Sequence, residues 1–201
     1  MKRATGIGAW EMTSHTRLMR MLATLVLALF LVMPASARAD QKDPRLPDLF
    51  TELAAAGTVE DAFRIERRIW DIWTRHDEAK IDALMSAGRR KMQPGAYDEA
   101  LAIFDKIVAE APDFAEGWNK RATLLYLIGD LEGSVRDIES TLALEPNHFG
   151  ALAGLGLIYR AINKPEAALK AFEKVLEISP QSLSVHLHIK QLRAELRGKK
   201  L

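Results

Sequence analysis

The chain has 201 residues, and its 28 basic and 27 acidic side chains almost cancel, leaving a formal net charge of +1. It contains no cysteine, which excludes disulfide bonds, thiolate metal sites and cysteine nucleophiles. Residues 1–39 hold five of the basic side chains and one of the acidic ones. The rest of the chain therefore has 23 basic and 26 acidic side chains, a net charge of −3. With no basic stripe along the chain, nothing favours nucleic acid as a partner.

The first 39 residues have the pattern of an export signal. Two arginines precede an apolar run over Met21–Met33, which Pro34 and a series of small residues follow. Cleavage is expected after Ala39 or Ala37, because either site places alanine at positions −1 and −3. The mature protein is therefore expected to be periplasmic.

The same apolar run can also be interpreted as a retained anchor in the inner membrane, facing the periplasm. Its thirteen residues fall short of the roughly 20 that cross a bilayer, so cleavage is the expectation and the anchor is the alternative. The charged end of the signal is long if translation starts at Met1. Met12 and Met19 are the other candidate starts.

A linker over residues 40–46 and a helical hairpin over residues 47–76 are predicted next. Leu49, Phe50 and Leu53 recur at helical spacing, Gly57 ends that helix, and Thr58 can cap the second helix. Trp70 and Trp73 lie three residues apart on one side of the second helix. We expect them to pack in the core against the first repeat described below, with a partner-binding surface as the alternative.

Three segments of 34 residues follow, at 81–114, 115–148 and 149–182. Three sets of residues recur at this interval, and they are Pro112, Pro146 and Pro180, then Phe104, Ile138 and Phe172, then Gly95, Gly129 and Asn163. Glycine and asparagine readily adopt the left-handed conformation that ends a helix, and proline stops the next one. Each segment is therefore predicted to hold two helices, at 81–92 and 97–110, 115–128 and 131–144, and 149–162 and 165–178.

This period and its residue pattern resemble the tetratricopeptide repeat family. The resemblance implies an all-α fold, an α-solenoid of helix-turn-helix repeats, with the N-terminal hairpin as a degenerate unit of the same kind. Residues 183–201 are expected to form a capping helix and a tail, because the last unit of a repeat array needs a polar outer face. The resemblance also implies that Trp118 is buried between the helices of its repeat, and Lys120 nearby is expected to be exposed.

No catalytic, cofactor-binding or metal-binding residues are expected. Gly154 and Gly156 fall inside a predicted helix and not in a phosphate-binding loop. His186 and His188 point to different sides of one helix, so they cannot share a metal ion. His148 stands at a junction between repeats and is expected to be a solvated loop residue.

The resemblance implies that the first helices of the repeats form a concave face that binds a protein segment. The residues expected to make the contacts are Arg89, Asn119, Thr123, Tyr126, Leu157 and Arg160. Glycine at 150 and 154 leaves out the third-repeat part of the clamp by which some family members bind acidic chaperone tails. The predicted function is a non-catalytic adaptor or assembly factor of the bacterial cell envelope with a protein or peptide partner. The alternative is a membrane-tethered accessory subunit that holds a neighbouring membrane protein.

Overall fold

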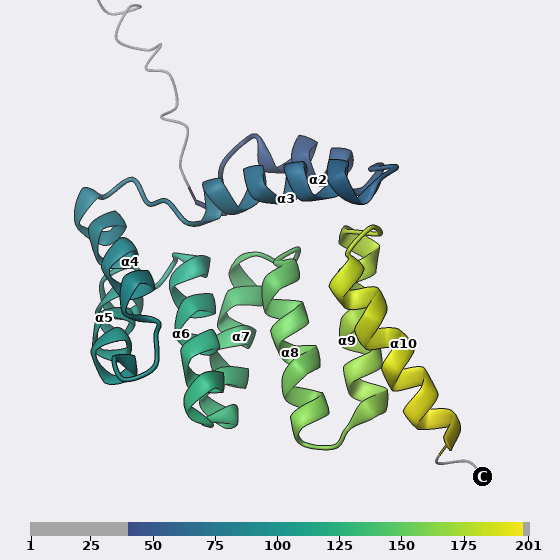
Figure 1. The fold of residues 1–201 in the computed structure, drawn as a ribbon. Coiled ribbons are helices and arrows are strands. Elements are labelled where there is room, and N and C mark those ends of the chain that lie inside the picture. The colour runs from purple at the N-terminus through teal and green to yellow at the C-terminus, as the bar shows by residue number, and fades with distance from the viewer. Residues whose placement is uncertain (1–39, 199–201) are drawn as a thin grey trace, which may run out of the picture. The chain divides into compact units, whose positions relative to one another are not determined.

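The computed structural model describes residues 40–198, which belong to one unit of the chain, Arg38–Leu201. The predicted signal, anchor and cleavage sites in residues 1–39 and the tail at 199–201 lie outside the described residues. The described part consists of helices joined by short loops, without a strand, which confirms the predicted all-α fold (Figure 1). The helices are α2 (Leu46–Ala54), α3 (Val59–Trp73), α4 (Ala79–Lys91), α5 (Tyr97–Glu110), α6 (Ala115–Ile128), α7 (Leu131–Leu144), α8 (Phe149–Ala161), α9 (Pro165–Ile178) and α10 (Leu183–Gly198).

The helices end where turn-forming residues punctuate the sequence. Gly95, Gly129 and Asn163 have positive φ angles of 87°, 89° and 56°, as predicted for the turn within each repeat. The Thr58 side chain accepts a hydrogen bond from the Asp61 amide and caps α3. At the start of α8, the His148 side chain accepts a hydrogen bond from the Ala151 amide and caps the helix.

Consecutive helices pair as α4 with α5, α6 with α7 and α8 with α9, and α10 packs against α9. A large side chain of the second helix fills the space left by a glycine of the first in two of these pairs. A Cβ atom on Gly88 would lie 2.7 Å from the Phe104 ring, and one on Gly156 would lie 2.7 Å from the Phe172 ring. Both phenylalanines are fully buried. Glycine therefore sets how closely the paired helices approach.

The α2–α3 hairpin lies crosswise over one end of the helical array (Figure 1). Leu53, Ile69 and Trp73 of the hairpin share a core with Phe149 of α8 and Phe172 of α9. Glu66 accepts a 2.7 Å hydrogen bond from Ser179, at the junction between α9 and α10. The hairpin therefore packs against the last part of the array, and the expectation that its tryptophans join it to the first repeat is wrong.

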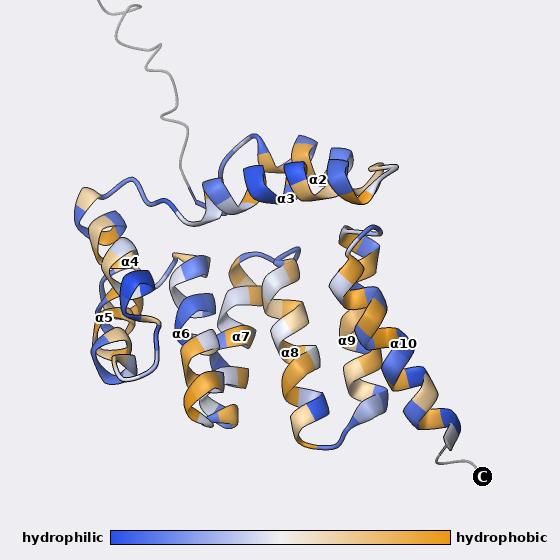
Figure 2. Ribbon diagram, viewed as in Figure 1, coloured by the Kyte–Doolittle hydropathy of each residue, from blue (hydrophilic) through white to orange (hydrophobic). Residues whose placement is uncertain are grey.

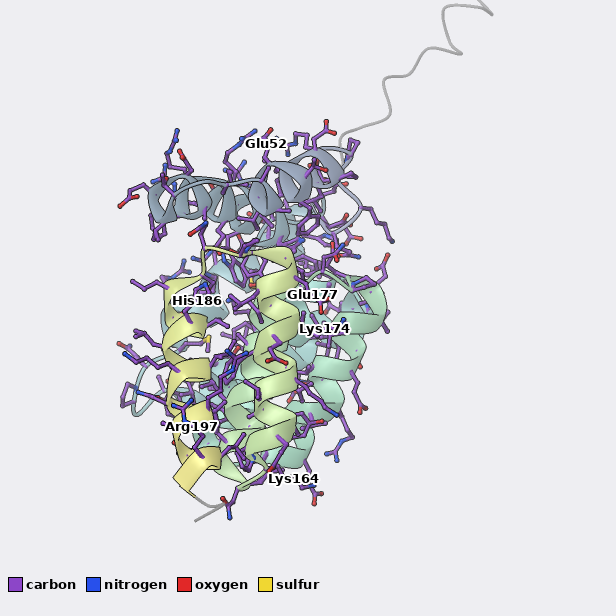
Figure 3. The ribbon with its side chains drawn as sticks, turned by 90° about the vertical axis from the view of Figure 1, so that its right-hand side faces the viewer. Glu52, Lys164, Lys174, Glu177, His186 and Arg197 are labelled. Carbon is purple, nitrogen blue, oxygen red and sulfur yellow. The ribbon has the colours of Figure 1, made fainter. Side chains whose placement is uncertain are left out.

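The end view shows how the hairpin covers the tops of α9 and α10 (Figure 3). Glu52 lies on the hairpin's upper side, while Lys174 and Glu177 lie on the outer side of α9, where they form an ion pair of 2.7 Å. Helix α6 changes character along its length: it is hydrophilic at the end next to the hairpin and hydrophobic at the far end (Figure 2). The face between α6 and α8 therefore has a polar end and an apolar end.

Candidate functional site

A pocket of about 210 Å³ lies between α6 and α8, with α7 behind it. Its walls carry no charged side chain. The lining residues are Asn119, Ala122, Thr123, Tyr126, Ser134, Ile138, Gly150, Ala151, Ala153, Gly154, Leu157 and Ile158. Small residues of α8 leave the space open: a Cβ atom on Gly154 would meet only the Ile138 Cδ1 atom, at an ordinary contact distance of 3.5 Å. A cavity of this size, below the roughly 300 Å³ at which small-molecule sites begin, fits one side chain.

The structure brings four of the six predicted contact residues together, because Asn119, Thr123, Tyr126 and Leu157 all line this pocket. Arg89 is exposed in the last turn of α4 and does not line it. Arg160 is drawn instead toward α10.

Arg160 lies beside the last helix of the array. Its Nη1 atom is 2.9 Å from the His188 ring and 3.3 Å from the Gln191 side chain, and Glu195 lies 3.7 Å from its Nη2 atom. The His188 ring stacks on Phe172, and burial together with the Arg160 charge lowers the pKa of His188. These contacts place Arg160 against α10, and it does not line the pocket.

The polar end of the pocket is built on a buried carboxylate that sequence reasoning did not select. Glu116 is 1% exposed, and its oxygens meet Asn119 Nδ2 at 2.8 Å, Lys120 Nζ at 2.9 Å and His148 Nε2 at 3.1 Å. Burial alone would raise the pKa of Glu116, but the Lys120 charge and the hydrogen bonds from Lys120 and His148 outweigh it and lower the pKa to about 2. The carboxylate is therefore ionised at neutral pH.

His148 is fully buried, and the expectation of a solvated loop residue is wrong. Its Nδ1 atom accepts the Ala151 amide, so the proton is on Nε2, which donates to Glu116. The ring also stacks on Trp73, with centroids 4.1 Å apart. The His148 imidazole therefore caps α8, donates to Glu116 and stacks against the N-terminal hairpin.

Trp70 of the hairpin packs against Gly150, one of the residues that line the pocket. A Cβ atom on Gly150 would lie 2.6 Å from the Trp70 ring, so only glycine fits at that position. The Lys120 ammonium lies 5.1 Å from the ring centroid, close enough for a cation–π contact. Lys120 is therefore held on two sides, with only 19% of its side chain exposed, and the prediction of an exposed lysine is wrong.

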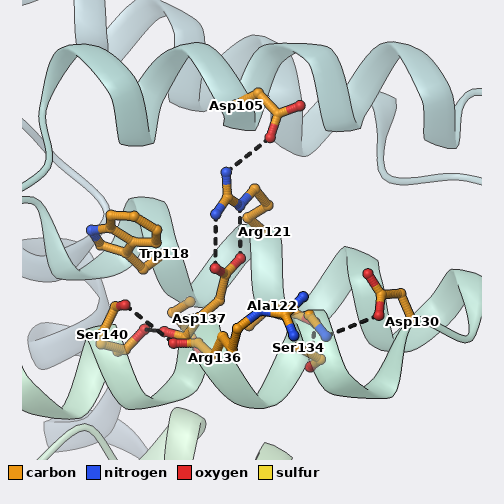
Figure 4. Close-up of polar contacts among 12 residues, drawn as sticks. Asp105, Trp118, Arg121, Ala122, Asp130, Ser134, Arg136, Asp137 and Ser140 are labelled. Atoms are coloured by element: carbon orange, nitrogen blue, oxygen red, sulfur yellow. Dashed lines mark hydrogen bonds and ion pairs between the residues drawn. The ribbon is translucent and has the colours of Figure 1, made fainter.

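Trp118 is only partly buried and lies outside the pocket. Its indole donates to the Pro112 carbonyl at 2.8 Å, and the Arg121 guanidinium lies 5.0 Å above its ring. Arg121 in turn forms two hydrogen bonds with Asp137 of α7 and one with Asp105 of α5 (Figure 4). Arg121 therefore links α6 to both α5 and α7 on this side. The expectation that Trp118 is buried between the helices of its repeat is wrong, because its side chain is only partly buried.

Within residues 40–198, no group of three or more His, Asp or Glu side chains is arranged to hold a metal ion. None of the helices in the described part of the chain combines the length and the hydropathy that a membrane span requires.

Two tetratricopeptide repeat family models match the chain, one over residues 85–139 and the other over residues 150–182. A TPR repeat-containing protein of Rhizobium etli is 34% identical over 154 residues, which cover 77% of this chain and 76% of the relative.

Solved structures share the fold at lower identity. The first TPR domain of Spaghetti (RPAP3), bound to the HSP90 peptide SRMEEVD, superposes with a TM-score of 0.57 at 24% identity, covering 60% of this chain and 96% of that one. The structure of MamA gives a TM-score of 0.55 at 21% identity and covers 70% of this chain and 79% of its own.

Proposed function

Because this chain belongs to the tetratricopeptide repeat family, we propose that it is a non-catalytic interaction module that binds a protein segment along α6 and α8. The observation that carries this proposal is the pocket between those helices. Asn119, Thr123, Tyr126 and Leu157 line it from two different helices, and its volume of about 210 Å³ suits one anchoring side chain. Interfaces of this kind gain most of their affinity from a few buried anchors.

The pocket also indicates the character of the segment. Its walls hold apolar groups and four neutral polar side chains, so an uncharged anchor is favoured over an acidic one. The domain of Spaghetti holds an acidic peptide, whereas in this chain Glu116 already takes the Asn119, Lys120 and His148 donors at the polar end. The partner's segment therefore differs from the acidic one held in that structure.

A substitution that fills the pocket without harming the fold tests this function. Gly154→Ala places a methyl group in the pocket and should raise the helical stability of α8, because glycine is a poor helix former. The full chain, carrying a C-terminal tag and expressed in its own cells, should capture its partner. Gly154→Ala should capture less of the partner, and Gly154→Leu, with its larger side chain, should capture less still.

Gly198→Ala serves as the matched control, since a Cβ atom there meets nothing within 4 Å and the site is remote from the pocket. It should leave capture unchanged. Undiminished capture by Gly154→Leu, with its melting temperature retained, would place the partner elsewhere on the molecule.

We propose further that the module works as an adaptor or assembly factor of the cell envelope, exported and cleaved after Ala39 or Ala37. The support is the sequence of residues 1–39, with its arginines, short apolar run and small residues. Sequencing of the N-terminus from a periplasmic extract should begin at Asp40 or Arg38. Full-length protein in the membrane fraction would support the tethered accessory subunit instead.

A further inference from the structure

The pocket's polar groups are not equally available to a ligand. Asn119, Thr123, Tyr126 and Ser134 together carry five polar hydrogens, two on the amide and one on each hydroxyl. Whether a ligand meets a donor or an acceptor depends on where those hydrogens already go.

Two hydroxyl hydrogens are committed to the backbone. Thr123 Oγ1 donates to the Asn119 carbonyl at 2.8 Å. Ser134 Oγ donates to the Ala122 carbonyl at 2.7 Å (Figure 4). Each hydroxyl oxygen keeps its lone pairs. Both side chains therefore meet a ligand as acceptors.

The amide of Asn119 is oriented by the buried carboxylate. An ionised carboxylate only accepts hydrogen bonds, so Nδ2 must be the atom that faces Glu116, at 2.8 Å. Lys120 and His148 fix Glu116 from its other sides and keep it ionised. Glu116 thus acts as a positioning residue: it takes one Nδ2 hydrogen, and it leaves Oδ1 as an acceptor beside the second Nδ2 hydrogen.

Three of the five hydrogens are used inside the protein, whereas all four oxygens retain accepting capacity. We propose, on the basis of the proposed function, that this pocket selects a tryptophan side chain of the partner segment. Indole joins an apolar ring, which matches walls such as Ile138 and Leu157, to a single N–H donor, which matches the acceptor-rich polar end. A carboxylate in this place would meet at most two donor hydrogens among four oxygens with lone pairs, and it would lose its hydration.

The test uses indole and benzofuran, which have the same shape but differ in a donor N–H against an acceptor oxygen. Both are titrated into the full chain, labelled with ¹³C at its methyl groups, and followed by NMR at Thr123, Ile138 and Leu157. Indole should shift these signals at millimolar concentrations, since a small fragment binds weakly. Benzofuran should bind about three- to tenfold more weakly, the effect of one hydrogen bond.

Thr123→Val removes one acceptor and keeps the shape of an exposed side chain, so the fold should be retained. The preference for indole should shrink in this variant. Thr51→Val is the matched control, because Thr51 makes the same hydrogen bond to a carbonyl four residues earlier, far from the pocket. Glu116→Gln, which frees the Asn119 amide to turn, should also narrow the preference.

Equal affinities for indole and benzofuran would overturn the proposed selectivity, as would methyl shifts confined to residues outside the pocket. These outcomes can be separated from failure of the proposed function. If Gly154→Leu abolishes capture while the two probes bind equally, the binding site stands and the tryptophan preference is wrong. If indole binds in the pocket while Gly154→Leu captures its partner normally, the pocket is selective but the partner docks elsewhere.

Discussion

Glu116 is a buried charge, and its environment decides whether it stabilises the fold. A carboxylate taken out of water costs several kcal/mol unless charges and hydrogen bonds replace its hydration. Lys120 is the only full positive charge in contact with it among the described residues, at 2.9 Å. The lysine's alkyl chain also carries its ammonium to the face of Trp70.

Replacing Lys120 by alanine should therefore lower the free energy of unfolding by about 2–4 kcal/mol, because it leaves the buried carboxylate without its cation. Lys174→Ala removes an ion pair whose partners are each 62% exposed and should change stability by less than about 0.5 kcal/mol. Urea unfolding of both variants gives the comparison. Similar midpoints for the two would mean that Glu116 does not depend on Lys120.

Acid should weaken the fold through the same carboxyl group. Its pKa falls from an ordinary 4.5 to about 2 on folding, so its contribution is complete above pH 4.5 and is lost as the pH drops toward 2. The lost contribution amounts to about 3 kcal/mol.

The measurement compares the full chain with Glu116→Gln in urea between pH 7 and pH 2.5. The wild type should lose its advantage over the variant across this range. Asp43, whose pKa Arg45 lowers, and Glu145, whose pKa burial raises, are common to both chains and cancel in the difference. If the difference in unfolding free energy between the wild type and Glu116→Gln stays constant with pH, the pKa of Glu116 is not lowered by folding.

The sequence predicted the residues on the walls of the pocket better than those behind them. Asn119, Thr123, Tyr126 and Leu157 followed from the family's contact positions. His148 did not, because an imidazole in a loop looks the same in a sequence whether it is solvated or buried beneath a hairpin. Ser134 carried a usable signal: it is polar where Ala100 and Ala168 stand in the other repeats, and a buried hydroxyl needs a partner.

At the scale of the helices, two glycines of α8 separated by one residue should respond in opposite ways to alanine. A methyl group on Gly156 would lie 2.7 Å from the Phe172 ring, which is fully buried and cannot move aside. Gly156→Ala should therefore destabilise by about 1–3 kcal/mol. Gly154→Ala should stabilise by roughly 0.5–1 kcal/mol, because its new methyl group only touches Ile138. Thermal unfolding measures the change in stability of each variant. If alanine stabilises at both positions or destabilises at both, the packing described above is contradicted.

Most helix boundaries could be predicted because each is set locally. Gly95, Gly129 and Asn163 mark turns through their backbone freedom alone, and the repeated prolines end the second helices. The docking of α2 and α3 could not be predicted in this way. An amphipathic face shows that a helix is covered, but the covering helices α8 to α10 lie far along the chain.

At the scale of the whole molecule, the hairpin links the start of the described chain to the end of the array. Trp73 is 1% exposed, stacks on His148 and packs on Phe149, so Trp73→Ala should cost about 3–5 kcal/mol. The variant should not lose protection against amide hydrogen exchange equally in all helices. Amides of α8 to α10 should exchange faster with deuterium in the variant, whereas α4 and α5, which have a core of their own, should change little.

The reverse pattern, with α4 and α5 more affected than α8 to α10, would show that the hairpin belongs to the first repeat. Phe63→Ala is a suitable control on the same helix, because Phe63 is 62% exposed and takes no part in the shared core. Its exchange pattern should match that of the wild type.

The docked hairpin also has a consequence for synthesis. Neighbouring repeats touch residues close in sequence and can form as soon as they are made, but Glu66 and Ser179 are 113 residues apart. The hairpin leaves the ribosome before α8 to α10, the helices that form its docking surface. Until then Leu53, Ile69 and Trp73 have no core to enter, because the entropy of closing the long loop is lost before the non-local contacts can compensate for it. The hairpin of the newborn chain therefore stays undocked until α8 to α10 have been translated.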